Sequence, residues 1–399
     1  MFSIILFDHS HQQLLPLTYA KPVSELRIGI LTIKEKWEKR LNVSISYKTE
    51  EYLQEKYALT ITDDNLIINS SVVANDAVTE EIKNLQLNEA LIQDNTVLAI
   101  RLSAENIVFT IDVAQLGKHV TTKESQANAI QVIRPYHIFS HNAQALQDDF
   151  DLLTKGRTSQ PISETNTVLG KENVFLEEGA IVECAILNAT KGPIYIGKNA
   201  LIMEGAIIRG GLGMCENSTL KMGAKIYGAT TLGVYCKVGG EVNNSIFQGY
   251  SNKGHDGFLG NSVIGEWCNL GADTNNSNLK NNYAPVKLWD YTTGRFGLTG
   301  LQFCGLIMGD HSKCGINTMF NTGTVIGFSS NIYGAGFPRN FVPSFAWGGS
   351  GGYMTFRMSK ALEVAERMME RRKEVLSEAD IKIFEYISQQ TTRYRSWEK

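Results

Sequence analysis

The sequence predicts an α/β N-terminal domain, then a left-handed parallel β-helix of hexapeptide repeats, then C-terminal helices. Three observations predict this order. Residues 1–155 mix apolar runs of strand length with segments of helical spacing, and residues 160–348 repeat an aliphatic side chain every six positions. Residues 355–399 carry an apolar stripe at helical spacing. A chain of 399 residues has room for two or three such domains.

The first region predicts two helices and a set of short strands. Ile30–Leu41 has helical spacing with its charges on one side, and His141–Thr154 reads as a linking helix with Asn142 as its N-cap. Apolar runs of strand length predict the strands. These are Ser3–Asp8, Asn65–Val73 and Thr96–Leu102.

The second region repeats with a period of six, which fits neither a helix nor a flat strand. Such a period describes a triangular coil, in which each flat side takes about six residues and one side chain per side points to the axis. Small residues four places after an axial residue fit where the chain turns. Near the beginning of this region, Ile186 stands at such a turn position. The predicted axial residues are Leu176, Val182, Ile196, Ile202, Ile208, Leu220, Ile226, Leu232, Val238, Ile264, Leu270, Met308, Cys314, Phe320 and Ile326.

Two segments interrupt this period, Asn243–Phe258 and Asn278–Phe303. A coil stacks without such excursions, so we expect them to serve binding or assembly. In the third region, "SEAD" at Ser377–Asp380 resembles a capping box in front of a helix. We expect the C-terminal helices to lie against the coil or a neighbouring subunit.

Composition narrows the class of partner. A net charge of −3 gives no electrostatic reason to expect nucleic acid or an anionic membrane. The six cysteines show no CxxC pairing, so we expect buried reduced thiols and not a zinc site. The N-terminal stretch lacks the basic region of a signal peptide and no apolar run is long enough to span a membrane, which predicts a cytoplasmic protein.

Two stretches carry a resemblance to a known family. "SNKGHDGFLGNSVIGEWCNLGADTNNSNLKNN" (Ser251–Asn282) and "LLPLTYAKPVSELRIGILTI" (Leu14–Ile33) resemble the bifunctional N-acetylglucosamine-1-phosphate uridylyltransferase/glucosamine-1-phosphate acetyltransferase family. The similarity is greatest to its shorter variant branch, labelled as sugar nucleotidyltransferase. The resemblance implies a homotrimer that acts on a sugar-1-phosphate, with acetyl-CoA as co-substrate and a nucleoside triphosphate with Mg²⁺ at the first domain.

The resemblance also implies roles for individual residues. His255 takes the position of the catalytic base, and we expect Asn269 and Asn278 to contact the sugar or acetyl-CoA. Phe258 and Lys280 are further candidates for this site, as is Lys253. Each of these two lysines, like Lys287 and Arg295, is a candidate phosphate contact or a solvated surface charge. In the first domain Lys21 and Arg27 are candidate phosphate contacts and Asp8 a candidate metal ligand, although Arg27 and Glu25 equally suit a structural pair.

Several positions depart from the family pattern. Asn243 stands in place of a lysine, Phe258 in place of a tyrosine, and Ile316 in place of a serine. The first strand is followed by "LFDHSHQQ", which has no glycine to let the backbone approach a triphosphate, and Asn69–Ser71 occupies the place of a metal-binding Asp. The alternatives are therefore an enzyme in which only one half works, and a non-catalytic nucleotide-sugar-binding protein or trimeric scaffold.

Overall fold

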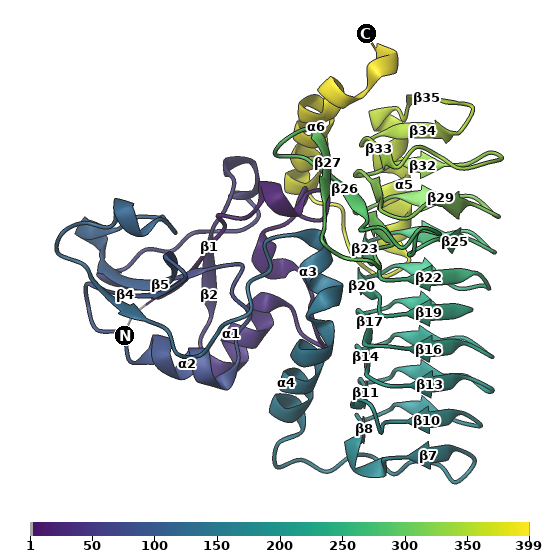
Figure 1. Cartoon of the computed structure of the whole chain (residues 1–399), viewed down its shortest axis with the longest axis horizontal. Coiled ribbons are helices and arrows are strands. Elements are labelled where there is room, and N and C mark those ends of the chain that lie inside the picture. The colour runs from purple at the N-terminus through teal and green to yellow at the C-terminus, as the bar shows by residue number, and fades with distance from the viewer. Residues whose placement is uncertain (1–2, 399) are drawn as a thin grey trace.

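The computed structural model describes residues 3–398 and has three parts (Figure 1). An N-terminal α/β domain lies beside a long parallel β-solenoid, and helices near the C-terminus lie alongside the end of the solenoid that is later in the sequence. The predicted fold class is confirmed. No helix within residues 3–398 is long and apolar enough to span a bilayer.

The N-terminal domain is built on a six-stranded mixed sheet in the order β2-β1-β3-β5-β4-β6. The central strands pair in parallel, β1 with β2 and β3, whereas β5 runs antiparallel to β3 and β4. Strands β1 and β3 are almost wholly buried because other parts of the domain cover both faces of the sheet, which explains their continuous apolar sequence. The strands are β1 Ser3–Phe7, β2 Ile45–Lys48, β3 Asp64–Asn69, β4 Glu89–Gln93, β5 Thr96–Ser103 and β6 Thr121–Glu124.

Four helices complete this domain and join it to the coil. They are α1 Ile33–Leu41, α2 Asp76–Lys83, α3 Pro135–Ser140 and α4 Asn142–Thr154. The helix predicted from Ile30 begins at Ile33, because Thr32 and Glu35 form a capping box that fixes its first turn. The prediction that Asn142 caps α4 is wrong. Its side chain is buried and bonds to the coil instead.

The coil consists of three parallel sheets, which we call the first, second and third coil sheets. The first contains β7 Thr167–Leu169, β10 Ile186–Asn188, β13 Ile207–Arg209, β16 Lys225–Tyr227, β19 Glu241–Asn243 and β22 Phe258–Gly260. The second contains β8 Val174–Leu176, β11 Ile194–Ile196, β14 Leu212–Met214, β17 Thr230–Leu232, β20 Ile246–Gly249, β23 Val263–Glu266, β28 Leu306–Met308, β31 Thr324–Ile326 and β33 Phe341–Val342. The third contains β9 Ile181–Val182, β12 Leu201–Ile202, β15 Thr219–Leu220, β18 Lys237–Val238, β21 Asn252–Lys253, β24 Asn269–Leu270, β29 Lys313–Cys314, β32 Asn331–Ile332, β34 Ala346–Gly349 and, paired antiparallel to β34, β35 Gly352–Thr355.

The predicted axial residues form the interior of the coil. All of them belong to one buried cluster. The period slips near the beginning, where Leu187 follows Val182 by five residues and takes the axial position. Ile186 therefore lies on the outer surface, 41% exposed, and not at a buried turn. Five of the six cysteines are buried as expected, and Cys184 is exposed.

The first predicted excursion, Asn243–Phe258, is part of the coil. It supplies β20 and β21 and runs from the end of β19 to the start of β22. The axial positions of this turn are held by Phe247, Lys253 and Leu259, which are six residues apart. The prediction fails because a lysine at an axial position does not look like an interior residue in the sequence.

The second excursion does leave the coil, between β25 Asn275–Asn276 and β28. It forms an antiparallel hairpin, β26 Lys287–Asp290 and β27 Arg295–Leu298, while β25 pairs with β30 Met319–Phe320. The ring of Tyr291 is buried against Tyr19 of the N-terminal domain, Phe341 of the coil and Tyr394 near the C-terminus, at centroid distances of 5.6–5.7 Å. The hairpin therefore joins all three parts of the chain.

The C-terminal helices pack at the same junction. They are α5 Met358–Glu370 and α6 Glu378–Thr391. The predicted capping box at Ser377 and Asp380 is present at the start of α6. Phe384 of α6 packs on the rings of His311 and Phe328 of the coil, at 5.0 and 4.7 Å between centroids.

Candidate functional site

His255 lies at a corner of the coil, between β21 and β22. Its side chain is exposed and makes no hydrogen bond within residues 3–398, whereas its backbone carbonyl accepts a bond from Lys253. Gly254 and Gly257 flank this corner, and Gly257 has φ +112° with the backbone of Thr274 so close that a Cβ would clash. The corner is therefore a tight, fixed turn that presents the imidazole to solvent.

His255 lines a groove of about 450 Å³ that runs over the third coil sheet. The floor includes Lys237, Asn252 and Asn269, which lie in register on the neighbouring strands β18, β21 and β24 and point outward. The structure thus brings Asn269 and His255 together, as predicted. Ile316, at the position where the family has a serine, also lines the groove and is 71% exposed.

One wall of the groove is part of a column of stacked rings, which we call the ring ladder. It consists of Tyr235, Tyr250, Trp267 and His311, at successive corners of the coil. Each has a left-handed φ between 54° and 60°, a conformation that costs bulky residues free energy. Stacking of the rings offsets this cost and makes the wall rigid. The ring centroids of Tyr250 and Trp267 are only 4.1 Å apart.

Another part of the lining comes from the end of α5, which packs against the ring ladder and which the sequence did not identify. Met368, Arg371 and Arg372 line the groove here, and Lys221 completes its basic side chains. The sequence signal was the pair of arginines in "MMERRK", but nothing in the sequence says which part of the coil the helix end reaches.

The structure places Lys253 inside the coil and not on a substrate-binding surface. Its side chain is 1% exposed, and Nζ donates to the carbonyl oxygens of Gly239 at 3.2 Å and His255 at 2.9 Å. Burial lowers the pKa of this amine to about 8, against the smaller opposing effect of Asp256 and Asp273. Lys253 therefore holds the His255 corner from within.

The remaining candidates near the coil lie apart from the groove. The Asn278 side chain donates to Asn261 Oδ1 at 2.8 Å, and Phe258 lies beside Asn278 around Gly260 on the first coil sheet. Lys280 donates to the carbonyl of Pro285 within the excursion. None of the three lines the groove with His255.

Asp8, the candidate metal ligand, is fully engaged by protein donors. Its two carboxylate oxygens accept from Thr49 Oγ1 at 2.7 Å, Val23 N at 2.9 Å and Ser70 Oγ at 3.1 Å, and one lies 3.0 Å from His11 Nδ1. This buried carboxylate ties together the ends of β1, β2 and β3. Within residues 3–398 no group of three or more His, Cys, Asp or Glu is arranged to hold a metal ion. The residues present here do not fit Mg²⁺.

Lys21 reaches out of its domain and into the coil. Its ammonium lies 2.6 Å from a carboxylate oxygen of Glu266 and 3.0 Å from one of Asp310. Desolvation raises the pKa of the partly exposed Glu266, but the lysine holds it below its usual value. Burial and the neighbouring Glu266 raise the pKa of Asp310 to about 6. Lys21 is occupied as a buried counter-ion and is not free to bind phosphate in this conformation.

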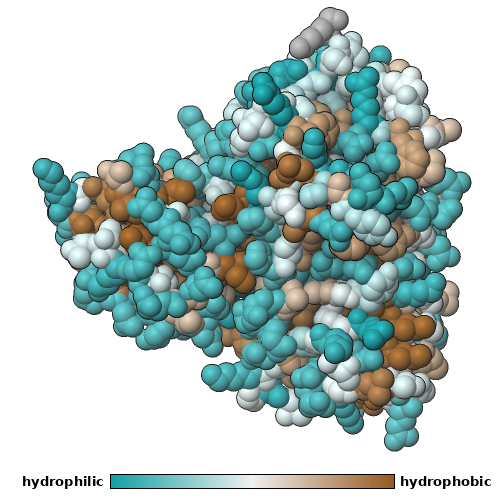
Figure 2. Space-filling view, in the orientation of Figure 1, coloured by the Kyte–Doolittle hydropathy of each residue, from teal (hydrophilic) through white to brown (hydrophobic). Residues whose placement is uncertain are grey.

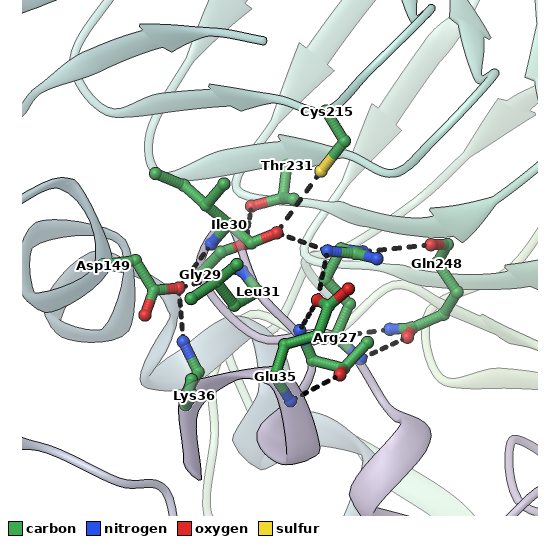
Figure 3. Close-up of polar contacts among 11 residues, drawn as sticks. Arg27, Gly29, Ile30, Leu31, Glu35, Lys36, Asp149, Cys215, Thr231 and Gln248 are labelled. Carbon is green, nitrogen blue, oxygen red and sulfur yellow. Dashed lines mark hydrogen bonds and ion pairs between the residues drawn. The ribbon is translucent and has the colours of Figure 1, made fainter. Parts of the chain in front are cut away.

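Arg27 lies at the same junction (Figure 3). Its backbone N–H and Nε donate to Gln248 at 2.6 and 3.3 Å, and its guanidinium also contacts the Ile30 carbonyl and Glu35. The sequence suggested that Arg27 could form a structural ion pair with Glu25, but its ion pair is with Glu35. Beside it, Asp149 of α4 accepts from the backbone of Ile30 and from the Lys36 ammonium.

The comparisons with known proteins bear on the N-terminal domain. A family model described as sugar nucleotidyl transferase matches residues 4–158, the N-terminal domain and α4. No curated protein matches the chain. Among solved structures, the chain is similar to an Arabidopsis UDP-N-acetylglucosamine acyltransferase at 13% identity and a TM-score of 0.17, over 60% of this chain and 98% of that one. The family match confirms the expected enzyme class, a transferase, and supports a role in nucleotide-sugar metabolism.

Proposed function

We propose that the coil transfers an acetyl group from acetyl-CoA to the amine of a hexosamine-1-phosphate, with His255 as the base. The observation that supports this best is the shared groove, where the exposed imidazole of His255 and the amide of Asn269 lie among basic side chains. A sugar phosphate and the acyl donor both carry phosphate, and a groove of this charge suits them.

The chemistry requires a proton acceptor and a donor. A sugar ammonium must lose a proton before its nitrogen attacks the thioester, and imidazole accepts protons near neutral pH. The new C–N bond forms as the C–S bond breaks and the thiolate of the carrier leaves. The second proton, which the nitrogen loses as the amide forms, goes to the thiolate. In this proposal the Asn269 amide donates a hydrogen bond to the acceptor sugar or to the thioester oxygen.

Nucleotidyl transfer by the first domain remains a prediction that the family match supports. The residues expected to bind phosphate and metal there are Asp8, Lys21 and Arg27, and all three are occupied by contacts within the chain. Acetyl transfer is therefore the activity that the described side chains favour, and a catalytically reduced binding protein or scaffold is the alternative.

A homotrimer, which the resemblance implies, also remains a prediction. Apolar side chains are exposed on the first coil sheet, including Leu169, Ile186 and Ile207 at 41–49%. Figure 2 shows hydrophobic residues gathered over β10 and β13. We expect this surface to be covered in the assembly. Light scattering on wild type and on Ile207→Asp measures the mass, and a monomeric wild-type chain would contradict the trimer.

The activity is tested by acetyl-CoA turnover with glucosamine-1-phosphate as acceptor. His255→Ala is expected to lower the rate by about 10²- to 10⁴-fold, as for loss of a general base. His119→Ala removes an exposed imidazole of the first domain and serves as the matched control. Unchanged turnover in His255→Ala would sink the proposal. Pyrophosphate release from UTP or dTTP with sugar-1-phosphates tests the first domain. No activity in either assay, together with intact nucleotide-sugar binding, would favour the non-catalytic binding protein or scaffold.

A further inference from the structure

The end of α5 faces the coil at the groove. The helix ends at Glu370, and the chain turns back at Lys373, whose φ is 61°. Between them Arg372 points to the coil, with its guanidinium carbon 5.6 Å from the centre of the Tyr235 ring. Arg371 and Met368 line the same groove. The direction of the Arg372 side chain is thus set by contact with the ring ladder and not only by attraction to the negative end of the helix dipole.

Four basic side chains of the groove have no carboxylate partner within residues 3–398. They are Lys221, Lys237, Arg371 and Arg372, and none forms an ion pair, whereas Arg367 one turn earlier pairs with Glu363 at 2.9 Å. No Asp or Glu within residues 3–398 lines the groove. Three carboxylates lie near its edge. Glu374 accepts a hydrogen bond from the Tyr250 hydroxyl at 3.2 Å, and Asp256 and Asp273 line an adjoining pocket together with His255 and Lys221.

The surroundings of Lys237 show the effect of this unbalanced charge. Burial is the largest cause that lowers the pKa of Lys237. Arg372, Lys221 and Arg371 lower it further because like charges disfavour the ammonium. Four cations that share one groove and form no ion pair there are a cost to the folded chain, and a bound anion lowers that cost.

We propose that Arg371 and Arg372 at the end of α5, with Lys221 and Lys237 of the coil, form a phosphate-binding site. Four positive charges match a diphosphate, or two phosphate groups, better than one monoester, which carries about −1.5 to −2 near neutral pH. The paired arginines supply the planar donor groups that bind phosphate oxygens two at a time. The C-terminal helices are then part of the ligand site. The proposal deepens the proposed function, because His255 lies in the same groove.

Isothermal titration calorimetry of the full chain with inorganic pyrophosphate tests the site. The double variant Arg371→Ala/Arg372→Ala is expected to bind pyrophosphate about 10- to 100-fold more weakly, as for lost hydrogen bonds to a charged ligand. Lys373→Ala removes a neighbouring exposed cation that does not line the groove, and its affinity is expected to stay within about twofold of wild type. Thermal unfolding of each variant shows that the helix pair remains folded.

Two results would overturn the proposal. One is wild-type affinity in the double variant, and the other is an equal loss in Lys373→Ala, which would mean general surface charge. Competition then identifies the source of the phosphate. Displacement of pyrophosphate by glucosamine-1-phosphate points to the acceptor, and displacement by acetyl-CoA points to the donor. If His255→Ala keeps full acetyl transfer while the double arginine variant binds pyrophosphate more weakly, the phosphate-binding site is supported and the proposed function is contradicted.

Discussion

Lys253 provides a direct test of how the coil and the candidate site are connected. Its side chain occupies the axial position at which the paired strand β18 has Val238, and it is 1% exposed. Replacing Lys253 by Met keeps an unbranched side chain of similar length, removes the charge, and removes the donor to the His255 carbonyl. The variant therefore removes the buried ammonium and its hydrogen bonds to the carbonyls of Gly239 and His255, while the length of the side chain is kept.

The size of the effect follows from the pKa. Burial lowers the pKa of Lys253 from 10.5 to about 8, so between these values the unfolded chain binds more protons than the folded chain. The free energy of unfolding of the wild type consequently rises as pH increases through this window. At about 1.4 kcal/mol for each pH unit, the rise attributable to Lys253 is about 3 kcal/mol. Lys253→Met lacks this rise.

The assay is urea unfolding of both proteins across the window from pH 8 to pH 10.5. The difference between their unfolding free energies isolates Lys253, because other titrations cancel, including that of Lys313, whose pKa burial also lowers to about 8. Lys225→Met, at an exposed position on β16, is the control and is expected to follow the wild type. Parallel pH profiles for wild type and Lys253→Met would refute the placement of a lysine inside the coil.

Three further predictions concern the contacts that hold the parts together. Lys21→Met leaves the buried Asp310 and the partly exposed Glu266 without a counter-ion and is expected to lower the free energy of unfolding by about 3–5 kcal/mol in thermal melts. Lys34→Met, in a more exposed pair, is expected to cost under about 1 kcal/mol. Asn142→Ala removes hydrogen bonds to Gly29 and Ala229, so we expect the free energy of unfolding to fall by about 1–3 kcal/mol and proteolysis after α4 to become faster. Gln144→Ala, on the exposed side of α4, is its control. Ser377→Ala removes the cap of α6 and costs about 1 kcal/mol, which Ser377→Asp is expected to restore.

The coil was predictable in detail because its sequence obeys one rule. Each turn needs an apolar side chain at the axis, and the residues found by the period of six are those that fill the core. The rule failed where the chemistry of the axial residue changed. Lys253 looks like a surface charge in the sequence, so the period of six predicts an excursion over Asn243–Phe258 that contains His255. The structure places His255 on a tight corner instead.

The α5 side of the groove was beyond prediction for a different reason. His255 and Asn269 belong to consecutive turns, so a repeat of known period brings them together. Arg371 and Arg372 come from a helix about a hundred residues further on, and their position depends on how that helix packs against the ring ladder. No local pattern encodes such packing. The same holds for the hairpin of Asn278–Phe303, whose Tyr291 contacts all three parts of the chain.

The stretch Leu14–Ile33, which carries the resemblance to nucleotidyltransferases, is also the stretch that docks the first domain on the coil. Lys21 bonds to two coil carboxylates, Arg27 bonds to Gln248, and the Gly29 carbonyl accepts from Thr231. A side chain that neutralises a buried carboxylate cannot neutralise a phosphate at the same time without leaving that carboxylate unpaired. A nucleotide on this domain therefore needs other contacts or a separation of the domain from the coil. The unpaired cations beside His255 are under no such constraint, and a phosphorylated ligand can bind them while this junction stays closed.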